Sequence, residues 1–287
     1  VLALKRRSTR RVVGKRGTEN RLSGKSLSGD CAQQDDASGR RTVTGREGAD
    51  NGMPDLGEHL ERYFLEVSCE CPYGQEQQAV YHQGMFSRLD DESMGRFLAS
   101  GYRRNGNCMY TMRCPDCRLC VPIRLRPKRL RHNRNQRRVW RRNQDISVEI
   151  APLTMSRENI VLLQRFLSSR FPEGRSSAES YYTGFFITSM TRCFEIRYRL
   201  EQQLIGVSVV DLSTAWMNAV YFFFDPDQAW RSPGTLNILT LNHICTTQKI
   251  PFLYLGYWID GLSAMSYKSA FRPHELLQEG DWQEVIW

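Results

Sequence analysis

The alternation of apolar and polar residues is clearest in the second half of the chain. Between residues 194 and 200, apolar side chains alternate with charged ones, which predicts a strand with one buried face. A polar turn at 201–203 leads into an apolar run at 204–212, so we expect these segments to form a hairpin. A third strand is predicted at 217–224, where the density of aromatic residues indicates burial on both faces.

Helical periodicity appears on either side of these strands. Ser156 is a favourable N-cap for a helix whose apolar residues form one stripe. Another helix is predicted from residue 232 to about 249, with Pro233 near its first turn, and a further strand at 252–257. Nearer the N-terminus the pattern is weaker and favours a helix around residues 60–64, capped by Asp55.

The remaining periodicity predicts a strand at 79–86 and a helix at 92–100. The order of hairpin, strand, loop, helix and strand indicates an α+β fold with a mixed, mostly antiparallel sheet and flanking helices. It is the order expected of an acyltransferase of the GNAT type, in which an open helix N-terminus faces a phosphate-bearing acyl donor. We expect a Cys- and Arg-rich region at 55–145 and a transferase region at 146–287.

Residues 1–50 differ from the rest of the chain. They contain no aromatic residue and show no hydrophobic period, which predicts a disordered basic tail. No apolar segment follows the first basic residues, so no secretory signal is expected. Elsewhere, no apolar run approaches the ~20 residues of a membrane-spanning helix, and we expect no membrane association.

Positive charge is concentrated in one block. The 287 residues hold 40 Lys and Arg against 31 Asp and Glu, a formal net charge of +9. Residues 103–142 contain 14 basic side chains and a single acid, whereas the chain beyond residue 50 is otherwise acidic. A block this basic indicates contact with phosphate or another polyanion, although a solvated arginine-rich face would have the same composition.

A cluster of cysteines suggests a metal site. Cys114, Cys117 and Cys120 are spaced three residues apart. Cys71 lies upstream, with Cys69 as the alternative fourth ligand. Thiolates at this spacing could hold zinc or an iron–sulfur cluster. The other interpretation, reduced thiols packed beneath a basic loop, remains open.

Several motifs occur in a fixed order between residues 55 and 277. They include a Cys-Pro-Tyr sequence, a Gly-Tyr-Arg-Arg-Asn-Gly loop, the triple-cysteine segment and an arginine run. The stretches are residues 71–73, 101–106, 114–124, 133–138, 142–145, 221–226, 234–235, 254–259 and 265–273. Together they resemble the aminoacyl-tRNA–protein transferases, and most closely the bacterial leucyl-tRNA–protein (aspartate/glutamate leucyl-) transferase branch.

The resemblance implies an enzyme of the N-degron, or N-end rule, pathway. Members of this family transfer an amino acid from its tRNA to the N-terminal amine of a protein, generally at Asp or Glu. The new N-terminus marks the protein for degradation. The resemblance therefore implies a GNAT-like fold, aminoacyl-tRNA as donor and proteins with N-terminal Asp or Glu as acceptors. It also implies a cytoplasmic location and no need for free ATP, coenzyme A or another cofactor in the transfer itself.

The motifs also provide candidate binding residues. Those for the acidic acceptor, whose carboxylate needs a cation, are Arg103, Arg104 and Arg272. Those for tRNA are Arg134, Gln136, Arg137, Arg138, Arg142, Asn143, Gly234 and Thr235. If residues 134–142 are helical, their arginines would line one stripe and contact phosphates without reading the RNA sequence.

Aminolysis of an activated ester needs a positioned neutral amine and donors for the developing oxyanion. Lys268 is a catalytic candidate, and Asp225 or Tyr267 could accept the proton of the amine. Asp225 could equally terminate a strand, and Tyr267 could belong to the core. No Ser/His/Asp arrangement is apparent, so we expect direct attack without a covalent intermediate.

The donor amino acid needs its own pocket. Apolar walls for leucine, which could equally be sheet core, are offered by Phe222, Phe224, Leu255, Tyr257 and Trp258. The compact folded region resembles the bacterial leucyl branch more than the much longer eukaryotic arginyl enzymes, and this resemblance favours leucine over arginine as donor. Three alternatives remain: an arginyl-tRNA–protein transferase, a coenzyme A-dependent N-acetyltransferase of the same fold, and a non-enzymatic zinc-ribbon protein that binds nucleic acid.

Overall fold

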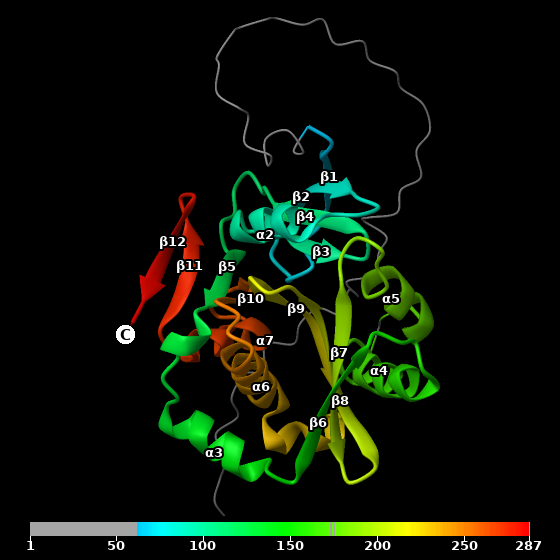
Figure 1. Cartoon of the computed structure of the whole chain (residues 1–287). Coiled ribbons are helices and arrows are strands. Elements are labelled where there is room, and N and C mark those ends of the chain that lie inside the picture. The colour runs from blue at the N-terminus through cyan, green and yellow to red at the C-terminus, as the bar shows by residue number, and fades with distance from the viewer. Residues whose placement is uncertain (1–61, 173, 175, 287) are drawn as a thin grey trace, which may run out of the picture.

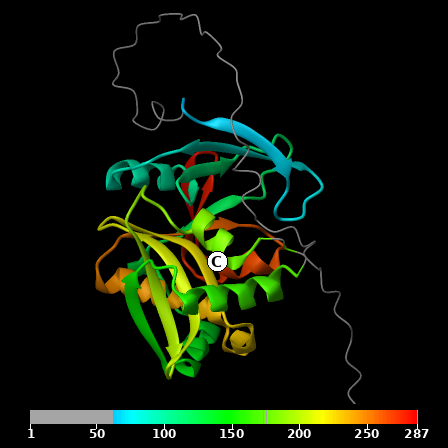
Figure 2. The same cartoon turned by 90° about the vertical axis from the view of Figure 1, so that its right-hand side faces the viewer.

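The computed structural model describes residues 62–172, 174 and 176–286. These residues form a small sheet and a large sheet, with helices on both faces of the large one (Figure 1, Figure 2). The predicted tail at 1–50 and the predicted cap at Asp55 lie outside the described residues. Among the helices that are described, none combines the length and the apolar character needed to span a bilayer.

The small sheet is antiparallel, with strand order β1-β2-β4-β3. Its strands are β1 (Leu65–Glu70), β2 (Gln78–Met85), β3 (Arg103–Asn105) and β4 (Cys108–Met112). Helix α2 (Asp91–Ala99) joins β2 to β3 and starts at Asp90, whose carboxylate accepts the backbone N–H of Ser93 at 2.7 Å. The predicted strand at 79–86 and helix at 92–100 are confirmed.

The helix expected around residues 60–64 is wrong for the residues that are described. Residues 62 and 63 form a turn, and Phe64 leads directly into β1. Phe64 is buried because its ring stacks on His82 with centroids 5.0 Å apart and meets the Tyr102 ring edge-on at 5.2 Å. These apolar residues therefore belong to an aromatic cluster and not to the stripe of a helix.

The large sheet has the strand order β12-β11-β5-β10-β9-β8-β7-β6. Its strands are β5 (Val121–Leu125), β6 (Ile146–Pro152), β7 (Cys193–Leu200), β8 (Gln203–Leu212), β9 (Trp216–Phe224), β10 (Phe252–Trp258), β11 (His274–Gln278) and β12 (Asp281–Val285). Among the strands that the structure describes, only β9 and β10 are parallel neighbours. The predicted strands at 194–200, 204–212, 217–224 and 252–257 are confirmed, as is the β7–β8 hairpin.

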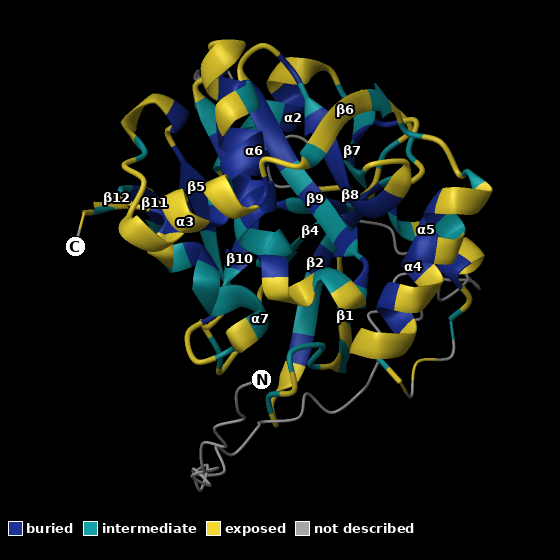
Figure 3. Cartoon of the chain, turned by 90° about the horizontal axis from the view of Figure 1, so that it is seen from below, coloured by how far each residue is buried: buried dark blue, intermediate teal, exposed yellow. Residues whose placement is uncertain are grey.

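Four main helices cover the large sheet, α3 and α6 on one face and α4 and α5 on the other (Figure 1, Figure 3). They are α3 (Arg134–Arg142), α4 (Arg157–Arg170), α5 (Ala178–Phe185) and α6 (Pro233–Thr247). A single turn, α7 (Ser263–Ser266), follows β10. The predicted helices after Ser156 and from residue 232 are confirmed, with Ser156 accepting the backbone N–H of Asn159 at 3.2 Å.

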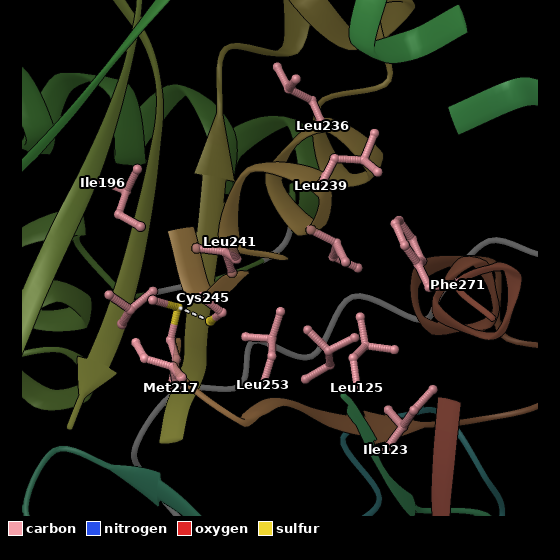
Figure 4. Packing of buried hydrophobic residues seen from close by; sticks show 14 of the residues in the cluster. Ile123, Leu125, Ile196, Met217, Leu236, Leu239, Leu241, Cys245, Leu253 and Phe271 are labelled. Atoms are coloured by element: carbon pink, nitrogen blue, oxygen red, sulfur yellow. Dashed lines mark hydrogen bonds between the residues drawn. The ribbon is translucent and has the colours of Figure 1, made fainter. Parts of the chain in front are cut away.

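Each face of the large sheet has its own core. Beneath α6, Leu239, Leu241 and Cys245 pack against Met217 and Leu253 (Figure 4). On the opposite face, α4 and α5 bury a second cluster against β8 and β9. The aromatic strand predicted to be buried on both faces is therefore β9.

The arginine-rich part of the predicted 55–145 region contributes to the large sheet. Strand β5 pairs with both β10 and β11, and α3 packs on α6. After the small sheet, the chain enters the large sheet as β5 and then forms α3 on one face of that sheet. The end of α3 lies beside the start of α6.

Candidate functional site

Strands β9 and β10 pair over only part of their length. Their parallel register covers Trp216–Asn218 and Phe252–Tyr254, although the strands continue to Phe224 and Trp258. The pairing of β10 with β5 is also irregular between Tyr254 and Tyr257, around Gly256 with φ +74°. Beyond Asn218 and Tyr254 the two strands no longer pair with each other, and we call these segments the unpaired strand ends. The backbone groups on their facing edges are therefore available to side chains.

Arg103 reaches these strand ends from the small sheet. Its Nη2 donates to the carbonyl of Val220 on β9 at 3.4 Å. Its guanidinium carbon lies 2.6 Å from where a Cβ of Gly256 would stand, and 5.3 Å from the ring centroid of Tyr257. Arg103 thus places a permanent cation between the unpaired ends of β9 and β10.

Tyrosines surround this guanidinium. Burial raises the pKa of Tyr73, Tyr110 and Tyr257, and each of them interacts electrostatically with Arg103. Their hydroxyls therefore stay protonated at neutral pH and can donate hydrogen bonds. The tyrosines come from three segments far apart in the chain.

Lys268 braces the irregular segment of β10. Its Nζ donates to the carbonyls of Leu255 and Tyr257 at 2.8 and 2.7 Å, and the residue is 8% exposed. Burial and the nearby Arg103 lower the pKa of Lys268 well below its usual value. Lys268 therefore lies near Arg103, and its ammonium group binds the carbonyls of β10 and does not point into solvent.

Tyr267 lies at the start of α6. Its hydroxyl is 3.4 Å from where a Cβ of Gly234 would stand. Burial raises the pKa of Tyr267 to about 12, so its phenol is a hydrogen-bond donor at neutral pH. The first turn of α6, which contains Gly234 and Thr235, has no side-chain cap, and its N–H groups favour an anion.

Asp225 closes the end of β9. Its carboxylate accepts the backbone N–H of Asp227 at 3.1 Å and forms an ion pair with Arg165 at 2.9 Å. Of the two interpretations of Asp225, the geometry matches termination of the strand. Its carboxylate is 2% exposed and already engaged.

The three arginines expected to bind the acceptor are not brought together. Arg104 is fully buried and paired with Asp211 at 2.8 Å. Arg272 is exposed, and its backbone forms a bridge with Arg131 near the start of α3. Among these candidates, the structure places only Arg103 at the unpaired strand ends.

The arginine run forms the helix that its spacing predicts. Within the described chain none of the arginines of α3 has an ion pair, and all are exposed (Figure 3). They are Arg134, Arg137, Arg138, Arg141 and Arg142. The two amide side chains among the tRNA candidates, by contrast, are structural. Asn133 caps α3 and the Gln136 side chain accepts the backbone N–H of Asn133, whereas Asn143 donates to the carbonyls of Val139 and Arg231.

The five residues expected to line a donor pocket lie in several environments, although Phe222 and Phe224 stack on each other with centroids 5.6 Å apart. Leu255, Phe222 and Trp258 pack in or against the core beneath α6. Phe224 meets Phe166 of α4 edge-on, at 5.2 Å between centroids. Tyr257 lies below Arg103. The described residues do not join these side chains into one pocket.

The cysteines of the predicted metal site do converge. Cys71, Cys114, Cys117 and Cys120 line one small cavity together with Tyr73. Burial, and then the other three cysteines, raise the pKa of Cys120 to about 12. A soft set of four sulfurs suits zinc or iron. However, no three His, Cys, Asp or Glu side chains within the described ranges are placed to hold a metal ion.

Arg170, at the end of α4, was not expected from the sequence. It is exposed, and it interacts with the hydroxyls of both Tyr221 on β9 and Tyr267. The ring of Tyr221 in turn packs on that of Tyr181 of α5, with centroids 5.6 Å apart. A cation that ends a helix carries no sequence motif, so only the fold reveals that Arg170 lies near these two tyrosines.

Comparison with known proteins adds a separate finding. The model of the family "Arginine-tRNA-protein transferase, N terminus" matches residues 69–138, and that of the corresponding C terminus matches residues 158–278. An aspartate/glutamate leucyltransferase of Hahella chejuensis is 34% identical over 189 residues, which cover 65% of this chain and 81% of the relative. One of Nitrosococcus oceani is 35% identical over 227 residues, which cover 77% and 94%.

Solved structures are more distant. The structure of L-PGS from Bacillus licheniformis has a TM-score of 0.38 and 11% identity, covering 64% of this chain and 57% of the other. A similarity this low does not inform the fold.

Proposed function

Since this chain belongs to the aminoacyl-tRNA–protein transferase family that includes the aspartate/glutamate leucyltransferases, we propose that it transfers leucine from leucyl-tRNA to the N-terminal Asp or Glu of proteins. The observation that carries this proposal is the match to leucyltransferases over most of both chains. The new N-terminus would mark the acceptor for degradation in the N-end rule pathway. We place the reaction in the cytoplasm, where aminoacyl-tRNA is made.

The donor tRNA would lie against α3. This helix presents exposed arginines without ion pairs in the described chain and contains no acidic residue. Such a surface neutralises phosphates and positions the RNA without reading its sequence. The uncapped first turn of α6 at Gly234 and Thr235 would take the phosphate nearest the aminoacyl ester. The ester would then reach the unpaired ends of β9 and β10.

The acceptor would approach from the small sheet. Arg103 offers a guanidinium at the unpaired strand ends, and the protonated hydroxyls of Tyr73 and Tyr110 lie beside it. A carboxylate at the N-terminal residue would pair with Arg103. Arg104 cannot share this role while it is paired with Asp211 inside the protein. The exposed Arg272, which lies near α3, would contact the tRNA and not the acceptor.

The reaction would be direct aminolysis. The neutral amine of the acceptor attacks the carbonyl carbon of the leucyl ester, a C–N bond forms, and the ester C–O bond breaks to release the ribose hydroxyl of the tRNA. The proton lost by the amine goes to the leaving oxygen or to water. Tyr267, with its pKa raised to about 12, would donate a hydrogen bond to the developing oxyanion.

A GNAT-like arrangement is the finer fold assignment that we propose. Two features support it. The parallel strands β9 and β10 are no longer paired with each other beyond Asn218 and Tyr254, and α6, which follows β9 and precedes β10 in the chain, starts without a side-chain cap. In such a fold the acyl donor lies at the unpaired strand ends. Coenzyme A is disfavoured as donor because residues 231–234, which lead into and begin α6, contain one glycine and do not form a glycine-rich pyrophosphate loop.

The donor is tested by mass spectrometry of the product. The purified protein is incubated with a peptide that begins with Glu and with leucyl-tRNA, arginyl-tRNA or acetyl-coenzyme A. We expect a leucyl peptide, and only with leucyl-tRNA. An arginyl product would reassign the donor, and an acetyl product without tRNA would contradict the proposal.

A further inference from the structure

An exposed tryptophan lies between the arginine helix and the start of α6. Trp230 is 60% exposed and belongs to the short 3-10 helix Pro226–Arg231 that joins β9 to α6. A tryptophan this exposed is unusual, because its large ring gains most from burial. Neither the catalytic step nor the fold of the core makes use of it.

Two arginines hold the ring in place. The guanidinium carbon of Arg231 lies 4.5 Å from the ring centroid, and that of Arg142 lies 6.0 Å from it. Arg142 also donates to the backbone carbonyl of Trp230 at 2.6 Å, which ties the turn to the end of α3. Arg231 is fixed by Asp145 at 2.9 Å. The indole is therefore preoriented although it is exposed.

The charge around the ring selects an anionic partner. Arg231 and Asp145 neutralise each other, whereas Arg165 pairs with both Asp225 and Asp227 and offsets only one of their two charges. The unpaired positive charge near the ring comes from the arginines of α3, a helix whose last residue, Arg142, contacts Trp230. A flat aromatic surface beside a row of cations is how proteins bind single-stranded nucleic acid, with bases stacked on the ring and phosphates on the cations.

We infer that Trp230 stacks on an unpaired nucleobase at the 3′ end of the donor tRNA. The inference rests on the proposed function, because the aminoacyl ester must reach the strand ends beside Gly234. Trp230 precedes Gly234 by four residues, so the nucleotides just before the ester pass its ring. Stacking there positions the 3′ end for every tRNA and reads no sequence, since each base has a π-face.

The test uses an RNA hairpin that ends in the single-stranded 3′ sequence of tRNA, and the same hairpin trimmed to a blunt end. Binding of both RNAs is measured for the wild type, Trp230→Ala and Trp230→Phe. We expect Trp230→Ala to bind the full hairpin about 10- to 100-fold more weakly, and the trimmed hairpin no differently from the wild type. Trp230→Phe should lie close to the wild type.

Tyr63→Ala is the matched control. Tyr63 is 59% exposed with Arg62 over its ring at 4.9 Å, and it precedes β1, at the opposite end of the molecule from α3 (Figure 1). This variant should bind both RNAs like the wild type.

Equal binding of the full hairpin by Trp230→Ala and the wild type would overturn the inference. If the wild type still transfers leucine in that case, the proposed function stands. A wild type that transfers no leucine would instead count against the proposed function.

Discussion

The guanidinium of Arg103 occupies the space that the missing side chain of Gly256 leaves open. A Cβ at Gly256 would lie 2.6 Å from the Cζ of Arg103 and 2.7 Å from its Nε. Glycine is thus required at this position for two reasons: its φ of +74° disfavours other residues, and a side chain would collide with Arg103. Through this contact the small sheet supplies a cation to the unpaired end of a strand in the large sheet.

Gly256→Ala should therefore displace Arg103. We expect transfer to a Glu-initiated peptide to fall about 100-fold, as for other small displacements of a positioning group. Gly261→Ala is the matched control, because Gly261 has φ +71° but nothing within 4 Å of its Cβ position. Both variants should lose about 1–2 kcal/mol of stability from backbone strain. Equal transfer rates for the two would show that the contact with Arg103 is unimportant.

The exposed arginines of α3 should set the salt dependence of tRNA binding. Arg138→Ala is expected to weaken binding and to lower the slope of log K against log salt by about 0.7 to 0.9. The measurement is a titration of tRNA binding across ionic strength. Arg96→Ala is the control, since Arg96 pairs with Glu92 on α2 at 2.8 Å, at the other end of the molecule (Figure 1). An unchanged slope in Arg138→Ala would exclude a phosphate contact there.

The buried pair of Arg104 and Asp211 should govern stability and not acceptor choice. Both side chains are fully buried, and Asp211 also accepts from Asn218 at 2.9 Å. Arg104→Met should lower the free energy of unfolding by about 3–5 kcal/mol, because it leaves an unpaired buried carboxylate. The double variant Arg104→Met/Asp211→Leu should recover part of that loss. A single variant as stable as the wild type in urea would refute this assignment.

Glu275 gives a prediction for pH. Burial opposes its ionisation, but hydrogen bonds from Arg126 and Arg124, both at 2.5 Å, hold the pKa of Glu275 below its ordinary 4.5. A lowered pKa in the folded state contributes stability above pH 4.5, and this contribution is lost as the pH falls below it. The stability advantage of the wild type over Glu275→Gln should therefore shrink between pH about 6 and about 3. A constant difference in unfolding free energy would contradict it.

Local periodicity predicted the elements whose burial follows a simple pattern. Residues 194–200 alternate cleanly, and the helix after Ser156 has one apolar stripe, so both were found. Strand β3 was missed because it contains no apolar residue, and β5 because an arginine interrupts its apolar residues. Arg124 of β5 is 7% exposed, since its guanidinium lies 4.1 Å from the Trp282 ring centroid and pairs with Glu275. Partners this distant in sequence cannot be inferred from local pattern.

The same limit applies to the candidate site. The motif supplied Arg103 and Arg104 as equal candidates, but Arg104 is paired with a residue 107 positions away. Alternation along β3 sends these neighbours to different environments, one to the strand ends and one to the interior. Charge in the sequence thus located the arginine helix correctly, whereas the separate roles of adjacent arginines required the fold.

The central claim is most directly tested by the choice of acceptor. Labelled leucyl-tRNA is presented with peptides that begin with Glu, Asp or Gln, for the wild type and for Arg103→Gln. We expect the wild type to label the Glu and Asp peptides at least about 100-fold more efficiently than the Gln peptide, because Gln keeps the shape of Glu and loses its charge. Arg103→Gln should abolish most of this preference. Labelling of no acidic peptide by the wild type, or equal labelling of Glu and Gln peptides, would contradict the account.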